Sequence, residues 1–275
     1  MIATLLAAAA MIWLTGSTIS NLWLPLAICT ISCALLWALS LYWQPNFLRG
    51  IATLVAFTPA FTLLMEAVAA TGRPLVDSQL GSIDAMLGLN AADIVAWVAQ
   101  YPRLSQAMQL IYFTTMPQTC LVMVANAEKP EMWVFIRRFI LASQITLCLF
   151  YFFPAEGVET VISPPVAARF HELRAGAPLD LQQAQGIVTF PSFHTAWALI
   201  ITASLWNSAW RWPAVVLNTL VITSTVTTGG HYVIDVLAGI VIAMVVILQP
   251  VQATSPASWL TSRWRRWRPS ARVAA

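Results

Sequence analysis

The sequence has very few charged residues for its length. Only 9% of its 275 residues are Asp, Glu, Lys or Arg, whereas 59% are hydrophobic. Soluble globular domains carry about 25% charged residues, so this composition excludes an ordinary soluble protein and predicts a polytopic membrane protein. With so little charge we expect one membrane domain and no separate soluble domain. The net charge of +3 is small, and nothing in the sequence indicates nucleic acid binding.

Residues that bind metals or form disulfides are also scarce. All four cysteines lie within apolar runs, where cysteine usually serves as a small buried hydrophobic residue. No cluster of carboxylates, histidines or cysteines has the spacing of a Zn²⁺ or Ca²⁺ site. We therefore expect no disulfide, no metal and no cofactor.

Long uncharged stretches predict the transmembrane helices. Residues 1–48 carry no charged side chain, and a helix needs roughly 20 apolar residues to cross a bilayer. The polar break Thr15-Gly16-Ser17-Thr18 divides this segment into a short first helix and a longer one over 22–43. No basic segment or Ala-x-Ala site flanks the first helix, which argues against a cleaved signal peptide. Six further spans are expected at 51–70, 104–125, 132–153, 192–206, 213–227 and 233–248.

These spans indicate an N-terminal helical pair (1–48), a membrane domain (49–250) and a basic tail (251–275). Two mixed segments interrupt the membrane domain. In 72–103, apolar residues recur at three- and four-residue spacing, which predicts amphipathic helices at the membrane interface. The polar segment 154–190 is long, and loops of this length are more often functional than idle.

Basic residues are unevenly divided between the two sides of the predicted domain. The side that contains 72–103 and 154–190 has four of the 14 basic residues, and the other side has ten. Because basic residues concentrate in the cytoplasm, we expect both segments to be extracytoplasmic. The arginine- and tryptophan-rich tail suits an anionic cytoplasmic surface.

Two of the three histidines begin long apolar runs on the predicted outer side. His194 follows Pro191-Ser192-Phe193, and His231 follows Gly229-Gly230. Proline suits the first turn of a helix and a glycine pair ends the preceding one, so both histidines are expected at helix N-termini, which favour anions. Asp235 lies four residues after His231 on the same helix face. Its carboxylate can fix the imidazole tautomer and leave the other nitrogen free to attack.

Two other interpretations are open for these residues. A lone histidine at a helix end is more often an interfacial hydrogen-bonding residue, and we interpret His171 in that way. The non-enzymatic alternative is a transporter or membrane scaffold in which Asp235 and Glu66 relay ions. The absence of an inverted repeat and the gathering of the histidines on one side argue against a transporter.

The runs Pro191-Ser192-Phe193-His194 and His231-Tyr232-Val233-Ile234-Asp235 resemble the second and third motifs of the type 2 phosphatidic acid phosphatase superfamily. That superfamily comprises membrane lipid phosphatases and phosphotransferases related to vanadium haloperoxidases. Phenylalanine before His194 and the Gly-His-Tyr-x-x-Asp-Val run are similar to the branch of the inositol phosphorylceramide synthases and, more distantly, the sphingomyelin synthases. The resemblance implies an all-α integral membrane fold with a six-span core, here with an added N-terminal helical pair.

The resemblance also implies the chemistry. His231 would attack phosphorus and form a phosphohistidine, Asp235 would orient His231, and His194 would protonate the leaving oxygen and then activate water or an alcohol. Ser192, Gly230 and helix-end N–H groups would hold the phosphate oxygens. The implied substrate is a lipid phosphate or phospholipid at the outer face of the membrane. Hydrolases and transferases of the superfamily would use the same residues, so both activities remain as alternatives.

Two positions depart from the family pattern. The third motif usually begins with Ser-Arg, but the arginine position holds Thr225. The first motif usually reads Lys, six residues, Arg-Pro, and Glu66 stands at the lysine position before Arg73-Pro74. The predicted site is thus short of two cations. We expect Arg73 to bind phosphate, with Arg169 or Arg174 of the long loop as candidates for the missing charge.

Overall fold

A computed structural model describes residues 2–158 and 164–250, which form an all-α protein as predicted. The predicted tail, 251–275, lies outside the described residues. The helices are α1 (Ile2–Thr15), α2 (Trp23–Leu39), α3 (Pro45–Ala69), α4 (Asp77–Met86), α5 (Ala91–Ala99), α6 (Pro102–Tyr112), α7 (Thr115–Ala125), α8 (Pro130–Phe152), α9 (Pro164–Arg174), α10 (Phe193–Ser204), α11 (Arg211–Thr227) and α12 (Val233–Leu248).

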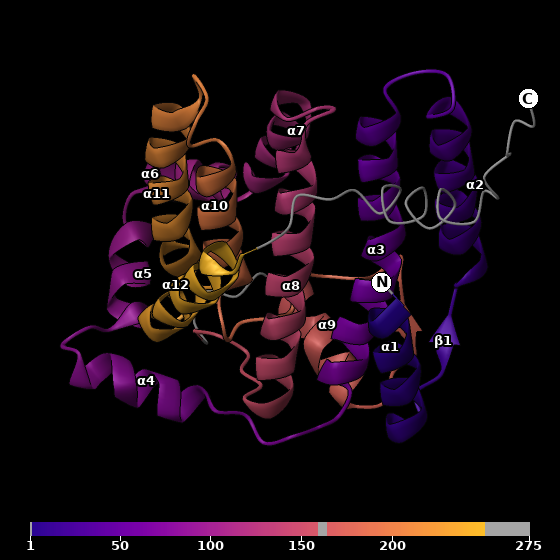
Figure 1. The fold of residues 1–275 in the computed structure, drawn as a ribbon. Coiled ribbons are helices and arrows are strands. Elements are labelled where there is room, and N and C mark those ends of the chain that lie inside the picture. The colour runs from indigo at the N-terminus through magenta and orange to yellow at the C-terminus, as the bar shows by residue number, and fades with distance from the viewer. Residues whose placement is uncertain (1, 159–163, 251–275) are drawn as a thin grey trace, which may run out of the picture.

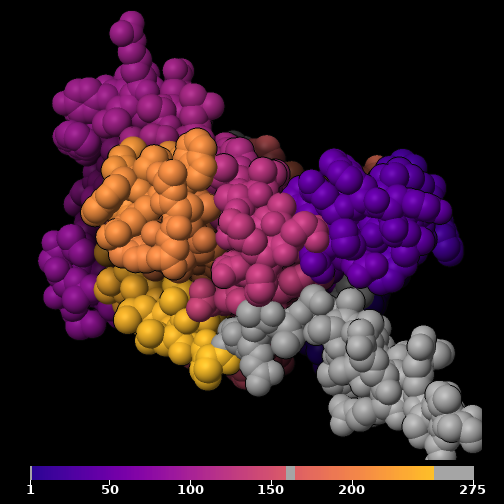
Figure 2. All heavy atoms as spheres, turned by 45° about the horizontal axis from the view of Figure 1, so that its top comes forward, coloured from indigo at the N-terminus to yellow at the C-terminus, as the bar shows by residue number. Residues whose placement is uncertain are grey.

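Helix α8 lies between two groups of helices (Figure 1). On one side α1 and α2 both pack against α3, and on the other α10 packs against α11 and α12. Figure 2 shows the N-terminal segment, in indigo, on one flank and the orange and yellow C-terminal helices on the other. Buried side chains of α7, α8, α10, α11 and α12 form the largest apolar core. The N-terminal pair is therefore an addition to the flank of α3.

Among the described residues, α3 and α8 are long and apolar enough to cross a membrane, with 25 and 23 residues. They overlap the spans predicted at 51–70 and 132–153, although α3 begins earlier, at Pro45. Helices α4 and α5 meet the same criterion only as a pair, and they are bent by 87° at their junction. Helix α2 has no buried residue and exposes Trp23, Leu24 and Ile31. Such an apolar surface belongs in lipid, as expected for an integral membrane protein.

The remaining predicted spans are shorter or interrupted. Helices α1, α2, α10 and α12 are apolar but have only 14, 17, 12 and 16 residues. The span predicted over 104–125 is divided at Phe113 and Thr114 into α6 and α7. The span predicted at 233–248 coincides with α12, and those at 192–206 and 213–227 closely match α10 and α11 (Arg211–Thr227). The spans predicted at 22–43 and 104–125 are too long, because the apolar runs there continue through turns, where hydropathy does not change.

Two short strands join the N-terminal segment to the long loop. β1 (Ile19–Ser20) pairs in parallel with β2 (Leu179–Asp180). The chain reaches β1 through the predicted polar break, where Gly16 has a φ of +65° that favours glycine. The Asn21 side chain donates to the Asp180 carboxylate at 2.8 Å. Strands of two residues have no readable periodicity, so the sequence did not predict this pairing.

A buried ion pair holds the long loop against α3. Glu66 is fully buried, and its two carboxylate oxygens accept hydrogen bonds from Arg169 of α9, both at 2.9 Å. The backbone N–H of Asp180 donates to the same carboxylate at 2.7 Å. Burial alone would lower the pKa of Arg169, but the hydrogen bonds and charge of Glu66 raise it above its ordinary value. Glu66 thus joins α3 to both α9 and β2.

We expect Glu66→Gln to destabilise the protein by about 3–5 kcal/mol, because it leaves the Arg169 charge buried without its partner. Thermal unfolding in detergent micelles measures the loss. Glu172→Gln is the matched control, since Glu172 is 54% exposed and lies 3.6 Å from the same guanidinium; it should cost less than about 1 kcal/mol. Equal losses in the two variants would show that the buried pair has no special role.

Candidate active site

The two histidine segments lie side by side in the structure. The Ser192 N–H donates to the carbonyl of Asp235 at 3.0 Å, which joins the start of α10 to the first turn of α12. Gly239, one turn further along α12, faces the same region. A Cβ atom at Gly239 would collide with the Ser192 carbonyl and lie 2.9 Å from the Thr195 Cβ. Glycine is therefore required for the close approach that brings the two segments together.

His231 and Asp235 form a buried pair at the start of α12. The imidazole Nδ1 lies 3.5 Å from the Asp235 Oδ2, and the side chains are 3% and 0% exposed. Oδ2 also accepts a hydrogen bond from the Tyr232 N–H at 2.8 Å, which fixes the carboxylate in place. Within the described part of the chain, neither the His231 Nδ1 nor the Asp235 Oδ1 has a hydrogen-bond partner, and the Asp235 carboxylate lies within ion-pair distance of Nδ1. Asp235 is therefore the group placed to fix the His231 tautomer.

His194 has an orienting partner that the sequence did not reveal. The Tyr112 hydroxyl of α6 lies 2.9 Å from the His194 Nδ1, and the two rings stack with centroids 4.0 Å apart. Trp197, one turn later in α10, donates from its indole to Thr119 of α7 at 2.9 Å. These contacts hold the first turn of α10 against α6 and α7. Tyr112 lies 82 residues before His194, and no local motif indicates such a contact.

The hydroxyl of Ser192 begins α10 as its N-cap. It accepts hydrogen bonds from the Thr195 N–H at 3.4 Å and from the Thr195 hydroxyl at 3.0 Å. Ser192 is fully buried, and its own O–H remains as a donor. Gly230 immediately precedes His231 and is half-buried. Their roles in phosphate binding stay predictions.

The N-terminus of α12 is already occupied by an anion. Asp84 of α4 accepts hydrogen bonds from the Val233 N–H at 2.8 Å and the Ile234 N–H at 2.9 Å. These are the N–H groups that an α-helix leaves without intrahelical partners. The expectation that this helix end holds phosphate is therefore corrected, because a buried carboxylate of the protein uses both donors.

The three candidate arginines make other contacts. Arg169 binds Glu66, so it does not supply the missing phosphate cation. Arg174 donates to the carbonyl of Arg73 at 2.9 Å and lies over the Phe170 ring. The Arg73 guanidinium lies 4.7 Å from the centre of the Tyr151 ring. Among the described residues, none of these contacts reaches His194 or His231.

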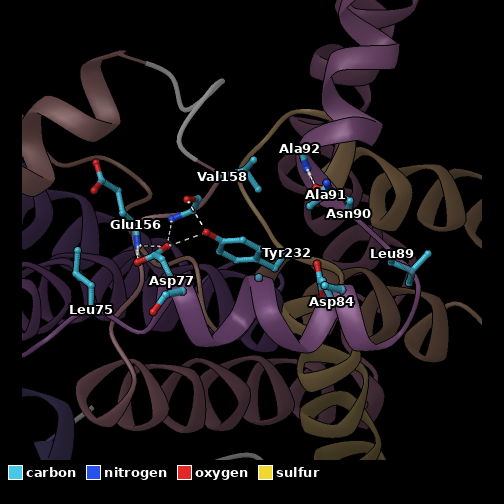
Figure 3. Close-up of a pocket in the computed structure, with 14 residues that line it drawn as sticks. Leu75, Asp77, Asp84, Leu89, Asn90, Ala91, Ala92, Glu156, Val158 and Tyr232 are labelled. Atoms are coloured by element: carbon cyan, nitrogen blue, oxygen red, sulfur yellow. Dashed lines mark hydrogen bonds between the residues drawn. The ribbon is translucent and has the colours of Figure 1, made fainter.

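A cavity of about 640 Å³ adjoins the start of α12 (Figure 3). Its lining includes three carboxylates, Asp77, Asp84 and Glu156, together with Asn90 and Tyr232, and among the described residues no basic side chain. Neither His194 nor His231 lines it. His171 lies 2.7 Å from the carboxylate of Glu156 and is 61% exposed. His171 thus binds a carboxylate outside the histidine pair.

A comparison with family models identifies the family of the chain. The model described as the PAP2 superfamily matches residues 78–249, more than half of the chain. The matched segment contains both buried histidines, whereas Glu66 and Arg73 precede it. No curated protein and no solved structure matches the chain.

Tyr112→Phe should release His194 while keeping the ring stack. Loss of the hydroxyl removes one hydrogen bond, worth about 0.5–1.5 kcal/mol of stability. We expect a changed Nδ1 nitrogen chemical shift for His194 in ¹⁵N-histidine-labelled protein, with His171 unchanged. Tyr101→Phe is the control, because Tyr101 is half exposed and its ring contacts Trp97 in a tilted arrangement, away from the histidines. An unchanged His194 resonance in Tyr112→Phe would contradict the orienting contact.

Proposed function

Because this chain belongs to the PAP2 superfamily, whose members have phosphatase- and phosphotransferase-type activities, we propose that it transfers a phosphoryl or phosphodiester group from a membrane lipid. The observation that supports this most directly is the buried His231–Asp235 pair, with an Nδ1 to Oδ2 distance of 3.5 Å. A carboxylate beside one imidazole nitrogen favours the tautomer whose other nitrogen carries the lone pair. The remaining nitrogen, Nε2, is the proposed nucleophile.

The reaction proceeds in two steps in this proposal. The His231 Nε2 attacks phosphorus and forms a P–N bond, while the bond from phosphorus to the leaving oxygen breaks. His194 gives its proton to that oxygen, and Tyr112 keeps the His194 ring in place. Water or an alcohol then attacks phosphorus, His194 takes the proton, and the P–N bond breaks. Asp235 stays ionised and stabilises the positive charge on His231.

Phosphate oxygens face the start of α10 in this proposal. Asp84 already fills the N-terminus of α12, whereas Ser192 keeps a hydroxyl proton to donate. The first N–H groups of α10 have no intrahelical acceptor by helix geometry, and Gly230 leaves room on the opposite side. Arg73 remains the candidate cation, although its guanidinium stacks on Tyr151. No metal is required in this mechanism.

Transfer to a lipid alcohol is the second candidate function, and the cavity beside α12 favours it. Carboxylates and an amide line the cavity, and a lining of this kind accepts hydrogen bonds from hydroxyl groups and disfavours phosphate. A hydroxyl-rich headgroup or acceptor could therefore lie there, as expected for a transferase like the inositol phosphorylceramide synthases. The ion-relay alternative is less favoured, because Glu66 is held by Arg169 in a structural pair.

We expect His231→Ala to abolish turnover of ³²P-labelled phosphatidic acid and phosphatidylinositol by the purified protein. The wild type should form an acid-labile, base-stable protein phosphate that is missing from this variant. Asp235→Asn presents an N–H where an acceptor is needed, and it should reduce the rate by about four orders of magnitude.

A double variant that combines His231→Ala with Asp235→Asn distinguishes the enzyme hypothesis from the ion-relay hypothesis. Residues that act as one unit give non-additive losses, so the double variant should be scarcely slower than His231→Ala. Protein-bound phosphate that persists in His231→Ala would show that another residue is the nucleophile. Additive losses, or strong turnover by Asp235→Asn, would rule out the nucleophile–orienter pair.

The proposed site faces away from the cytoplasm, as the four-to-ten division of basic residues predicts. In a variant without native cysteines, a cysteine at the exposed Ala175 should react with an impermeant maleimide in intact cells. A cysteine at Ala209, in the exposed turn between α10 and α11, is the control and should react only after permeabilisation. The reverse pattern of labelling would show that the proposed site faces the cytoplasm.

A further inference from the structure

Helix α4 attaches to the catalytic segment at two points. Asp84 is only 1% exposed and binds the first two N–H groups of α12, although it lies 149 residues earlier in the sequence. Asp77 accepts hydrogen bonds from the N–H groups of Glu156 and Gly157 at 2.9–3.1 Å. It also accepts one from the Tyr232 hydroxyl at 3.3 Å (Figure 3). Because seven residues are nearly two helical turns, both carboxylates lie on one face of α4.

The turn that carries His231 is therefore held from both ends. Before the histidine, the Gly229 carbonyl accepts a hydrogen bond from the Val158 N–H at 3.3 Å. After it, Val233 and Ile234 are bound by Asp84. A carboxylate at a helix N-terminus is stabilised by the helix dipole and by charge-assisted hydrogen bonds. Asp84 does not contact the reacting nitrogen, but it fixes the backbone from which His231 projects.

We propose that Asp84 is a positioning residue for His231. By filling the N-terminus of α12, its carboxylate sets the orientation of the first helical turn. This inference rests on the proposed function of His231. A nucleophile misplaced by about 1 Å loses roughly 10²-fold in rate even when the substrate still binds.

The test compares Asp84→Ala, Asp84→Asn and Asp93→Asn in the full-length protein in lipid nanodiscs. Asp93 is an exposed acidic residue of α5 and is the matched control. With ³²P-labelled phosphatidic acid or phosphatidylinositol, we expect Asp84→Ala to lower kcat by about 10²-fold with little change in KM. Asp84→Asn keeps one acceptor oxygen and should recover part of the rate. Asp93→Asn should match the wild type.

Hydrogen–deuterium exchange of the peptide that contains Val233 and Ile234 gives a readout independent of activity. We expect faster exchange of this peptide in Asp84→Ala than in the wild type and Asp93→Asn. Wild-type kcat, a raised KM with unchanged kcat, or unchanged exchange in Asp84→Ala would overturn the proposal. So would failure of both Asp84 variants to fold, which would assign the carboxylate to folding alone. An inactive wild type with the expected exchange would instead reject the proposed function.

Discussion

The buried ion pair of Glu66 and Arg169 is the constraint on which the position of α9 and β2 against α3 depends. A carboxylate in the interior must be neutralised and hydrogen-bonded, because an unpaired buried charge costs several kcal/mol. Glu66 achieves both through the guanidinium of α9 and the N–H of Asp180. Arg169, which the sequence offered as a candidate phosphate cation, neutralises this carboxylate instead. The pair that holds the loop therefore removes one candidate cation from the predicted site.

Local spacing predicted the parts of the site that lie within one segment. His231 and Asp235 are four residues apart, which predicted their contact on one helix face. The structure places His231 just before the N-cap residue Tyr232 of α12, so the turn into the helix brings the two side chains together. The pairing of the two histidine segments was implied by family motifs and agrees with the Ser192–Asp235 hydrogen bond. The sequence did not predict the roles of Tyr112 and Asp84, because their contacts with His194 and Val233 join residues that are 82 and 149 positions apart in the chain. From sequence alone, a tyrosine or aspartate in an amphipathic segment is assigned to the membrane–water interface. Only the tertiary structure reveals a partner far away in the chain.

Hydropathy predicted that the chain is helical and apolar, but it did not fix where the helices end. The spans containing α3 and α8 were recognised because long apolar runs continue for more than 20 residues. The segment 104–125 is divided at Phe113 and Thr114, and these two residues do not interrupt the apolar pattern. Burial reversed another expectation: Arg169 was a candidate for the missing phosphate cation, but it is only 4% exposed. The net charge at a site depends on which charged side chains form ion pairs in the folded protein. Composition does not contain that information.

The pairing of β1 with β2 has a consequence for biosynthesis. The Ser20 hydroxyl donates to the carbonyl of Leu179, 159 residues later in the chain. At a synthesis rate of about 5–20 residues per second, the ribosome needs roughly 8–30 s to make that interval. The pairing of β1 with β2 is therefore a late event, whereas α1 and α2 can pack against α3, which follows them directly in the chain, long before β2 is made.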